Sequence, residues 1–517
     1  MRPPGKELIV KVLLVVSLPV ILSVFFVIAA SHFGYTPDDT YIYLQFAKNL
    51  IRGEGVAFNA GHPTYGITGP LWLLIIAAGG LFGADLLMSA KIVDLLFACA
   101  SVMMFSFLAF EVIRDRVVAL AATGAFALNA WFLRWAGSGM ETSLAVLLVV
   151  AAVWFCLRNE YLPATVAAAL LALVRPEALL LQGFIIADVF LNTEDRKRAF
   201  RVAVTVTLTY SAVILPWALY AALTFGTVVP NTALAKAGFH ISAAGTASTF
   251  LDLGKAICAT DTVTVLVLLV CGGLVMLRRR EWIARAEHAA NYRFYLLRQS
   301  LLGLGWVTAL VLLYGLTGVN MISRYVLLVT PFIVLYAFFF LDRVLVHMNA
   351  LRLRYAAAMI CCLAVMAQNH FVFHYAVSPG IGAFAKGMEE CFVPIGKWFH
   401  NNTPPGTVIF ASDVGALGYY SDREICDGAG LVSPEMLPLV RGGYTFERLV
   451  AEKFYRTRSR AAYVVYRSFT EGGPAGDRDL VPLFTLVMPR MKLLETRPTY
   501  YTVCRVTSTV QQRSQDG

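Results

Sequence analysis

Charged side chains are scarce in this sequence of 517 residues. Asp, Glu, Lys and Arg together make up 15% of the chain, whereas 58% is hydrophobic and the mean hydropathy is +0.66. A soluble globular protein carries about 25% charged residues, because its surface must be wetted. The shortage of charge therefore excludes a soluble globular protein and predicts a polytopic α-helical membrane protein.

The sequence also lacks patterns that would indicate other classes of protein. It has no CxxC pair, no Cys/His cluster of metal-site spacing, no internal repeat, and no small-residue cleavage site after the apolar run 8–30. That run is therefore predicted to be a retained helix rather than a signal peptide. A disulfide among Cys391, Cys426 and Cys504 stays open, because this region is expected to face an oxidising compartment.

Long apolar runs, in contrast, are abundant. The run at 70–83 is short for a membrane span and favours an interfacial or re-entrant helix. Hydropathy predicts about 11 transmembrane helices, near 8–30, 89–111, 117–134, 141–157, 162–174, 177–191, 201–223, 260–277, 299–317, 325–341 and 355–372. The short runs 162–174 and 177–191 meet at Arg175-Pro176-Glu177, which predicts a tilted or broken pair.

Basic residues decide the predicted orientation. If the run 70–83 does not cross the membrane, most basic residues fall on the cytoplasmic side, including the clusters 196–198 and 278–280. If the run crossed, every later loop would change sides. Basic residues collect in cytoplasmic loops, so the N-terminus is predicted to be cytoplasmic and the C-terminus extracytoplasmic. The same distribution explains the net charge of +10 without nucleic acid.

The composition changes near the end of the last apolar run. Residues 376–517 contain the strand-like runs TVIFAS, AAYVVY and YYTVCRV among turn and helix signals. This pattern predicts a small mixed α/β domain outside the membrane. The expected division is thus a membrane domain over 1–375, with a first extracytoplasmic loop over 31–88, and the extracytoplasmic domain over 376–517.

Polar motifs at the ends of the spans all fall on the predicted outer side. They are Asp38-Asp39 and His62 in the first loop, GSGMET (137–142), RPE (175–177), PNTALAK (230–236) and SRY (323–325). An ionisable group at mid-bilayer costs roughly 2.5–3.5 kcal/mol on insertion scales. A gathering of such groups at one interface therefore predicts a functional site.

Each of these residues also has a structural interpretation. Asp38 or Asp39 could cap the helix expected over TYIYLQFAKNLIR, but two adjacent acids repel, and one can then acquire the raised pKa that suits a base. Glu141 could compensate a helix dipole, and Arg175 and Glu177 could form a local ion pair. His62 could be an ordinary loop histidine, Lys236 could contact lipid headgroups, and Tyr325 could belong to an aromatic belt.

Taken together, the acids and bases indicate one kind of chemistry. Carboxylates beside Lys236, Arg324 and Arg175 could hold a phosphate while a nearby hydroxyl loses its proton. Arginine forks onto phosphate oxygens and lysine adds a point charge, so a departing phosphate would be stabilised as its charge grows.

The order of these motifs resembles the GT-C superfamily of polyprenyl-phosphate-dependent glycosyltransferases. An early Asp-Asp pair, an apolar hairpin in the first loop, G-M-E-T, R-P-E, P-N-T with a following lysine, and S-R-Y occur in that order along nearly the whole chain. The pattern is similar to the mycobacterial terminal arabinofuranosyltransferases, and SDVGALGYYSDREICDGAGLVSPE (412–435) looks like the extracytoplasmic tail of that subgroup.

The resemblance implies an inverting transferase of the bacterial plasma membrane in cell-envelope polysaccharide synthesis. It implies a lipid-linked donor, a glycan or glycolipid acceptor, and a first-loop acid, Asp38 or Asp39, as general base. Donor phosphate is assigned to His62, Arg175, Lys236 and Arg324, and sugar or acceptor to Glu141, Glu177, Asn231 and Tyr325.

Three matters stay open on the sequence alone. No cofactor is required, although Mg²⁺ or Mn²⁺ could bind Asp38 and Asp39. The transferred sugar and the acceptor are not identified, because no acceptor-recognition motif is matched. The alternatives are a transporter of a polar or anionic substrate and a noncatalytic scaffold that binds glycan.

Overall fold

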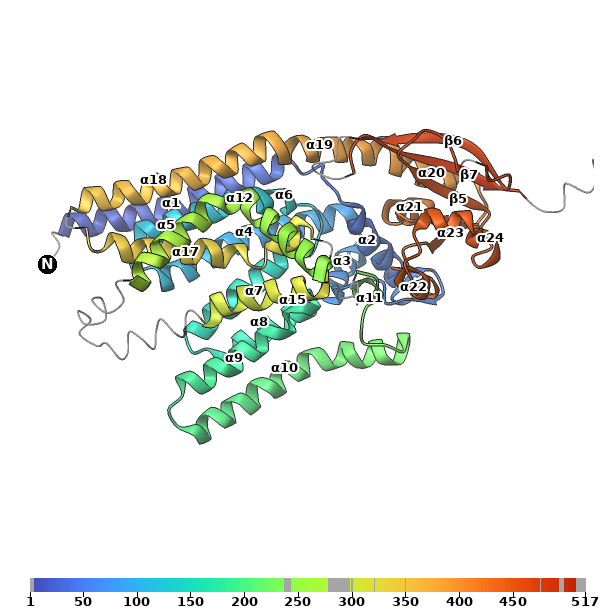
Figure 1. Ribbon diagram of the computed structural model, residues 1–517. Helices are drawn as coiled ribbons and strands as arrows, with labels where there is room; N and C mark the ends of the chain where they lie inside the picture. The colour runs from blue at the N-terminus through green and yellow to red at the C-terminus, as the bar shows by residue number, and fades with distance from the viewer. Residues whose placement is uncertain are drawn as a thin grey trace, which may run out of the picture. The chain divides into compact units, whose positions relative to one another are not determined.

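A computed structural model describes residues 4–236, 243–277, 298, 301–319, 321–348, 350–474, 476–491 and 497–507 (Figure 1). Its contacts divide the chain into two units. The helical unit contains Met1–His32, Ile92–Trp217 and Phe239–Val377, and the loop–sheet unit contains Phe33–Lys91, Ala218–Gly238 and Ser378–Gly517. Each unit is described by itself.

The helical unit is built from apolar helices joined mostly by short loops. Helix α12 packs on α15, α17 and α18, α5 packs on α1, α17 and α18, and α7, α8 and α9 pack in chain order. The elements are α1 (Pro4–Ser31), α4 (Leu86–Val112), α5 (Arg116–Ala127), α6 (Ala130–Trp135), α7 (Thr142–Leu157), α8 (Tyr161–Ala172), the 3₁₀ helix η1 (Pro176–Ala178), α9 (Leu179–Asn192), α10 (Arg196–Phe225), α12 (Ala243–Leu277), the π-helix η2 (Leu301–Gly305), α15 (Trp306–Thr317), α16 (Ser323–Val326), α17 (Thr330–Leu345), α18 (Leu351–Val372) and the π-helix η3 (Phe373–Val377).

Each apolar run predicted to span the membrane coincides with at least one of these helices. Within the described residues, four helices are long and apolar enough to cross a membrane: Leu86–Val112, Arg196–Phe225, Gly245–Leu277 and the helix within Leu351–Asn402. Shorter apolar helices lie at Val16–Ser31, Pro70–Leu81, Arg116–Ala127, Thr142–Leu157, Tyr161–Ala172 and Leu301–Thr317. The basic cluster 278–280, on which the predicted orientation partly rests, lies outside the described residues.

Local chemistry explains where helices differ from the expected runs. The run 117–134 is two helices, because the Asn129 side chain accepts hydrogen bonds from the amides of Trp131 (3.1 Å) and Phe132 (3.2 Å) and caps α6. The run near 260–277 begins instead at Ala243, and α12 is kinked at Asp261, whose φ is −119°. The short run 70–83 forms α3 (Pro70–Leu81), which at 12 residues rises about 18 Å, less than the roughly 30 Å hydrocarbon core.

The loop–sheet unit joins the first loop to the C-terminal residues. Its sheet has the order β4-β3-β5-β7-β6. Strands β4, β3 and β5 run parallel to one another, and β7 pairs antiparallel with both β5 and β6. The elements are α2 (Asp38–Ile51), β1 (Ala57–Asn59), β2 (His62–Pro63), α3, α11 (Asn231–Lys236), α19 (Ser378–Gly387), the π-helix η4 (Met388–Phe392), α20 (Val393–Asn402), β3 (Val408–Ala411), α21 (Gly415–Ser421), β4 (Glu424–Asp427), η5 (Pro434–Met436), α22 (Leu437–Arg441), α23 (Phe446–Ala451), α24 (Phe454–Thr457), β5 (Tyr463–Ser468), β6 (Leu480–Met488) and β7 (Thr499–Val506).

The predicted mixed α/β character of the C-terminal region is confirmed. The three strand-like runs form β3, β5 and β7. Strand β6 was not predicted because Pro482 interrupts it, and proline is confined to edge strands and bulges. It is indeed an edge strand with an irregular register between Pro482 and Phe484.

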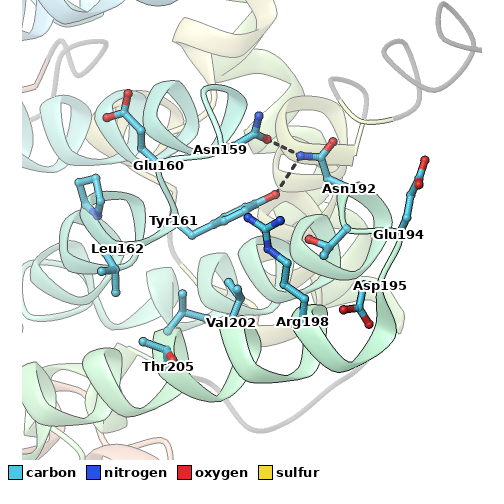
Figure 2. Close-up of a pocket in the computed structure, with 13 residues that line it drawn as sticks. Asn159, Glu160, Tyr161, Leu162, Asn192, Glu194, Asp195, Arg198, Val202 and Thr205 are labelled. Carbon is cyan, nitrogen blue, oxygen red and sulfur yellow. Dashed lines mark hydrogen bonds between the residues drawn. The ribbon is translucent and has the colours of Figure 1, made fainter.

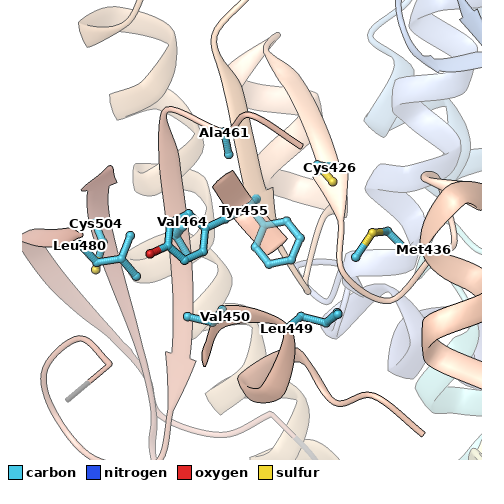
Figure 3. Packing of buried hydrophobic residues seen from close by; sticks show 10 residues of the cluster. Cys426, Met436, Leu449, Val450, Tyr455, Ala461, Val464, Leu480 and Cys504 are labelled. Carbon is cyan, nitrogen blue, oxygen red and sulfur yellow. The ribbon is translucent and has the colours of Figure 1, made fainter. Parts of the chain in front are cut away.

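A compact apolar core fixes this sheet to its short helices (Figure 3). Tyr455 is fully buried within it, and its hydroxyl donates to Asp477 Oδ2 at 2.8 Å. Cys426 and Cys504 belong to the same core. All nine cysteines are free thiols, so the disulfide left open by the sequence is not formed in this structure.

The first loop closes the other edge of the sheet. The Asn59 amide donates to the carbonyl of Ile425 in β4 at 2.8 Å, and its carbonyl oxygen accepts from the Ile425 amide at 2.9 Å. An open strand edge is a template for aggregation. Asn59 therefore occupies the place of a neighbouring strand and attaches the loop to the domain.

Replacing Asn59 by Ala should lower the unfolding temperature of the purified protein. The change leaves the amide and carbonyl of Ile425 without these partners, at a cost of about 1–3 kcal/mol for each buried group. The control is Asn401→Ala on α20, because Asn401 is exposed. Equal unfolding temperatures for the two variants would show that Asn59 does not hold the loop.

Candidate active site

A buried ion cluster lies in the helical unit where α7, α8 and η1 meet. Arg175 immediately precedes η1 and is 4% exposed. Its Nη2 lies 2.8 Å from Oε1 of Glu141, and its Nη1 lies 3.7 Å from Oε1 of Glu177. Glu141 is 1% exposed and stands at the N-cap position of α7, but its side chain does not cap the helix. The Glu141 carboxylate therefore forms an ion pair with Arg175 and does not cap α7.

Aromatic side chains surround these charges. The Tyr314 hydroxyl donates to Glu177 Oε1 at 2.9 Å. The Arg175 guanidinium lies 5.2 Å from the ring centre of Tyr325, and that of Arg324 lies 5.6 Å from the same ring. Arg324 is 5% exposed. We call Glu141, Arg175, Glu177, Arg324 and Tyr325 the acid–base cluster.

The acid–base cluster keeps polar atoms available for a ligand. Within the described part of the chain, Glu141 Oε2 and Arg175 Nε are buried and have no hydrogen-bond partner. Buried polar atoms without partners are rare and costly in native proteins. One is an acceptor and the other a donor, so together they could bind a hydroxyl group.

The GSGMET loop is held in place by Asp94 of α4. Asp94 is fully buried, and its Oδ2 accepts from the Ser138 hydroxyl (3.2 Å) and the Gly139 amide (3.0 Å). Gly137 and Gly139 have φ angles of 76° and 82°, which favour glycine. These contacts fix the turn that leads into Glu141.

The acidic pair of the first loop lies in the loop–sheet unit. Asp38 and Asp39 occupy the first turn of α2, and the N-cap residue of this helix is Pro37. Neither acid is the N-cap residue itself, but both stand in the first turn, where a negative charge is favoured by the helix dipole. Asp38 instead accepts from the backbone amides of Gly415 (2.9 Å) and Ala416 (2.8 Å) at the start of α21.

This contact is close enough to require glycine. A Cβ atom at position 415 would lie 2.0 Å from the backbone oxygen of Asp38. Burial raises the pKa of Asp38 to about 7, and the nearby Asp413 adds to the rise, whereas the two backbone amides oppose it. Lys91, which is 3% exposed, donates to the Tyr35 carbonyl (2.7 Å) and the Thr36 hydroxyl (2.8 Å) and so fixes the chain just before α2.

The remaining predicted site residues also lie in the loop–sheet unit. His62 lines a cavity of about 410 Å³ together with Glu424, Glu435 and Arg458. The Asn231 amide donates to the Tyr65 carbonyl at 2.8 Å and its side chain to the Leu431 carbonyl at 3.5 Å. Lys236 ends α11, and its side chain lies outside the described residues.

The predicted residues are thus divided between the two units, and only those of the helical unit are seen to converge. Glu141, Arg175, Glu177, Arg324 and Tyr325 converge within the helical unit, whereas Asp38, Asp39, His62, Asn231 and Lys236 belong to the loop–sheet unit. Among the described residues, no three His, Cys, Asp or Glu side chains gather as a metal site.

Sequence reasoning missed Asp94, Lys91 and Tyr314. The first two are charges within or beside the apolar run 89–111, and an ionisable residue at membrane depth is itself a signal of function. Tyr314 carried no such signal, because a tyrosine in an apolar helix is ordinary. Its role depends on a glutamate 137 positions earlier in the chain.

Comparison with solved structures shows which fold carries these sites. ArnT from Cupriavidus metallidurans bound to undecaprenyl phosphate superposes with a TM-score of 0.52 at 14% identity, over 94% of this chain and 97% of that one. The archaeal oligosaccharyltransferase of Archaeoglobus fulgidus, tethered to an acceptor peptide, gives 0.55 at 14% identity, over 87% and 69%. The chain has the GT-C glycosyltransferase fold.

Sequence comparison adds one family. Residues 384–512 match DUF8728, a domain of unknown function, which lies within the loop–sheet unit. No curated protein matches the chain. The arabinofuranosyltransferase subgroup therefore stays a prediction from the motifs.

Replacing one member of the Glu141–Arg175 pair should leave a buried charge unmatched, and replacing the second member as well should add little further loss of stability. Glu141→Leu or Arg175→Leu alone leaves a buried charge without its closest partner, at a cost of about 3–5 kcal/mol. The double variant should lose less than the sum, as measured by thermal unfolding. The control cycle is Arg158 with Glu160, an exposed pair at 3.0 Å, whose coupling should be about 0–1 kcal/mol. Additive losses at Glu141 and Arg175 would contradict the pairing.

Asp38 should make stability depend on pH. Because its folded pKa of about 7 exceeds the ordinary 3.8, folding favours the protonated form, so this stabilisation is complete below the ordinary pKa and is lost as pH rises to about 7. Asp38→Asn has no such proton. The difference in unfolding temperature between wild type and variant should therefore fall from about pH 4 to about pH 7 and level off above that. A difference that is constant over this range would show that the pKa is not raised.

Proposed function

We propose that this protein is a membrane glycosyltransferase that moves a sugar from a polyprenyl-phosphate donor to an extracytoplasmic glycan or lipid acceptor. The observation that carries the proposal is the buried acid–base cluster within a GT-C fold. A transferase of this kind needs cations for a departing phosphate and polar groups for a sugar, and the acid–base cluster offers both.

The donor phosphate is assigned to Arg324 and Arg175, with Lys236 and His62 as further candidates from the sequence. Both arginines are almost fully buried, and a cation in a water-poor site stabilises a developing oxyanion more strongly than one in water. The ArnT structure was solved with undecaprenyl phosphate bound, which supports a lipid phosphate as the ligand class. Glu141 and Glu177, with Tyr325 and Asn231, are assigned to the sugar or the acceptor.

We assign the general base to Asp39. Both oxygens of Asp38 face the backbone amides of α21, which gives that carboxylate a positioning role. Successive residues of a helix project about 100° apart, so Asp39 points in a different direction. In the proposed step the Asp39 carboxylate takes the proton of an acceptor hydroxyl, whose oxygen bonds to C1 of the sugar as the bond from C1 to the phosphate oxygen breaks, with inversion at C1.

The order of the motifs favours a furanose donor and a role in the bacterial cell envelope. This part of the proposal rests on the resemblance of the motifs to the terminal arabinofuranosyltransferases. Asp38 and Asp39 are also the residues that would bind Mg²⁺ or Mn²⁺ if transfer proves sensitive to chelation.

Asp39→Asn should reduce sugar transfer by about 10²–10⁴-fold, because an amide cannot take up the proton. Binding of the polyprenyl-phosphate donor should persist, since the arginines are untouched. The measurement is transfer from a labelled donor by purified protein in liposomes, with a panel of glycan acceptors.

The matched controls are Asp38→Asn and Asp422→Asn. Asp422 is an acid of the same unit that pairs with Lys48 and Arg52. Normal transfer by Asp39→Asn would remove Asp39 from the mechanism. Donor movement across the bilayer without consumption would favour the transporter, and glycan binding without either would favour the scaffold.

A further inference from the structure

The helical unit also has an open cavity of about 920 Å³ between the α8–α9 pair and the first turns of α10 (Figure 2). It begins where α7 ends, whereas Glu141 stands where α7 begins. The 16 residues of α7 rise about 24 Å. The cavity is therefore distinct from the acid–base cluster, and on the topology predicted from loop charge it faces the cytoplasmic leaflet.

One end of the cavity is polar and carries charges of both signs. The Arg198 side chain extends toward Tyr161 and Asn192, Asp195 lies near the base of Arg198, and Glu194 lines the cavity farther from it (Figure 2). Asp195 also accepts from the Lys197 amide at 2.9 Å and so caps α10. Within the described ranges, Arg198 forms no ion pair with either carboxylate. One cation and two anions thus face the same space.

A hydrogen-bond network holds the polar end of the cavity in place, and in it Asn192 also donates to the Asn159 side-chain carbonyl. The Tyr161 hydroxyl donates to Asp188 Oδ2 at 3.1 Å, and the Asn192 amide donates to the Tyr161 hydroxyl at 3.2 Å. Asp188 is fully buried and binds Arg298 through two contacts, of 2.7 and 2.9 Å. This buried pair sets the position of the tyrosine before any ligand arrives.

The opposite wall of the cavity is apolar. Leu162, Val202 and Val206 line it. Val202 and Val206 belong to α10, a candidate membrane span of which little is covered by other helices. On the same helix α10, Phe200 and Leu208 are 63% and 65% exposed. These apolar side chains therefore face lipid.

We propose that this cavity binds one glycerophospholipid whose headgroup is zwitterionic and ends in a primary amine. Arg198 binds the phosphodiester, Glu194 and Asp195 bind the ammonium group, and the acyl chains follow Leu162, Val202 and the exposed face of α10. Charge complementarity selects this class, because an anionic lipid, polyprenyl phosphate included, offers no cation to the two carboxylates. A trimethylated amine cannot donate hydrogen bonds to them. The proposal does not depend on the glycosyltransferase activity.

The test measures which lipid the intact protein retains. Protein reconstituted in nanodiscs with equal parts of phosphatidylethanolamine, phosphatidylcholine and phosphatidylglycerol is delipidated stepwise, and bound lipid is counted by native mass spectrometry. The wild type should retain one phosphatidylethanolamine, about tenfold in preference to phosphatidylcholine. Equal retention of the three lipids, or displacement by added polyprenyl phosphate, would overturn the proposal.

Variants separate the two halves of the headgroup. Arg198→Gln should lose retention of both zwitterionic lipids, whereas Glu194→Gln with Asp195→Asn should keep retention but lose the preference for the primary amine. Asn still caps α10 in the second variant. The control is Arg201→Gln, an exposed basic residue of α10 that does not line the cavity. A loss at Arg201 equal to that at Arg198 would show general attraction of lipid to basic residues and would overturn the site.

Discussion

A guanidinium held out of water must be matched by carboxylates, and Arg175 is such a group. Proline at 176 disfavours helix at the residue before it, and Arg175 is extended, with φ −141° and ψ 107°. The chain therefore breaks between α8 and α9 where the cation stands. Glu141 at the start of α7 and Glu177 in η1 neutralise it, and Tyr314 of α15 orients Glu177. The convergence of these helix ends, and the site built on them, depends on this pairing.

The two neighbouring acids of the first loop illustrate how environment assigns different roles to the same chemical group. Asp38 faces the amides of α21, which the DUF8728 region supplies. In many βα units that position binds an anionic ligand, and here a side chain of the same protein occupies it. The first loop and the C-terminal domain thus form one structural unit. The Asp38 side chain attaches the loop to α21, and the Asn59 side chain attaches it to β4.

Much of the fold could be predicted from the sequence because a membrane imposes strong patterns. Apolar runs located the helices, and the short run 70–83 formed a helix too short to span the membrane. What failed depended on single side chains: Asn129 split one run by capping α6, and Pro482 concealed an edge strand. The site was predictable as a set of residue types at span ends, and Glu141, Arg175, Glu177, Arg324 and Tyr325 do converge. The partners of Asp38 and the role of Tyr314 were not predictable, because those contacts join residues hundreds of positions apart or carry no polar signature.

Burial also decides how the two cationic sites of the helical unit can be used. The desolvation of Arg175 and Arg324 is completed on folding, and their guanidinium groups stack against aromatic rings that hold them in place. A charge that develops beside them meets dipoles and cations that need not reorganise, which is the condition under which electrostatics lowers a barrier. Arg198 is exposed, so its interactions are weakened by water and salt. An exposed arginine such as Arg198 can select a lipid by the sign and spacing of the lipid's charges. The buried arginines, Arg175 and Arg324, are the ones suited to stabilising a transition state.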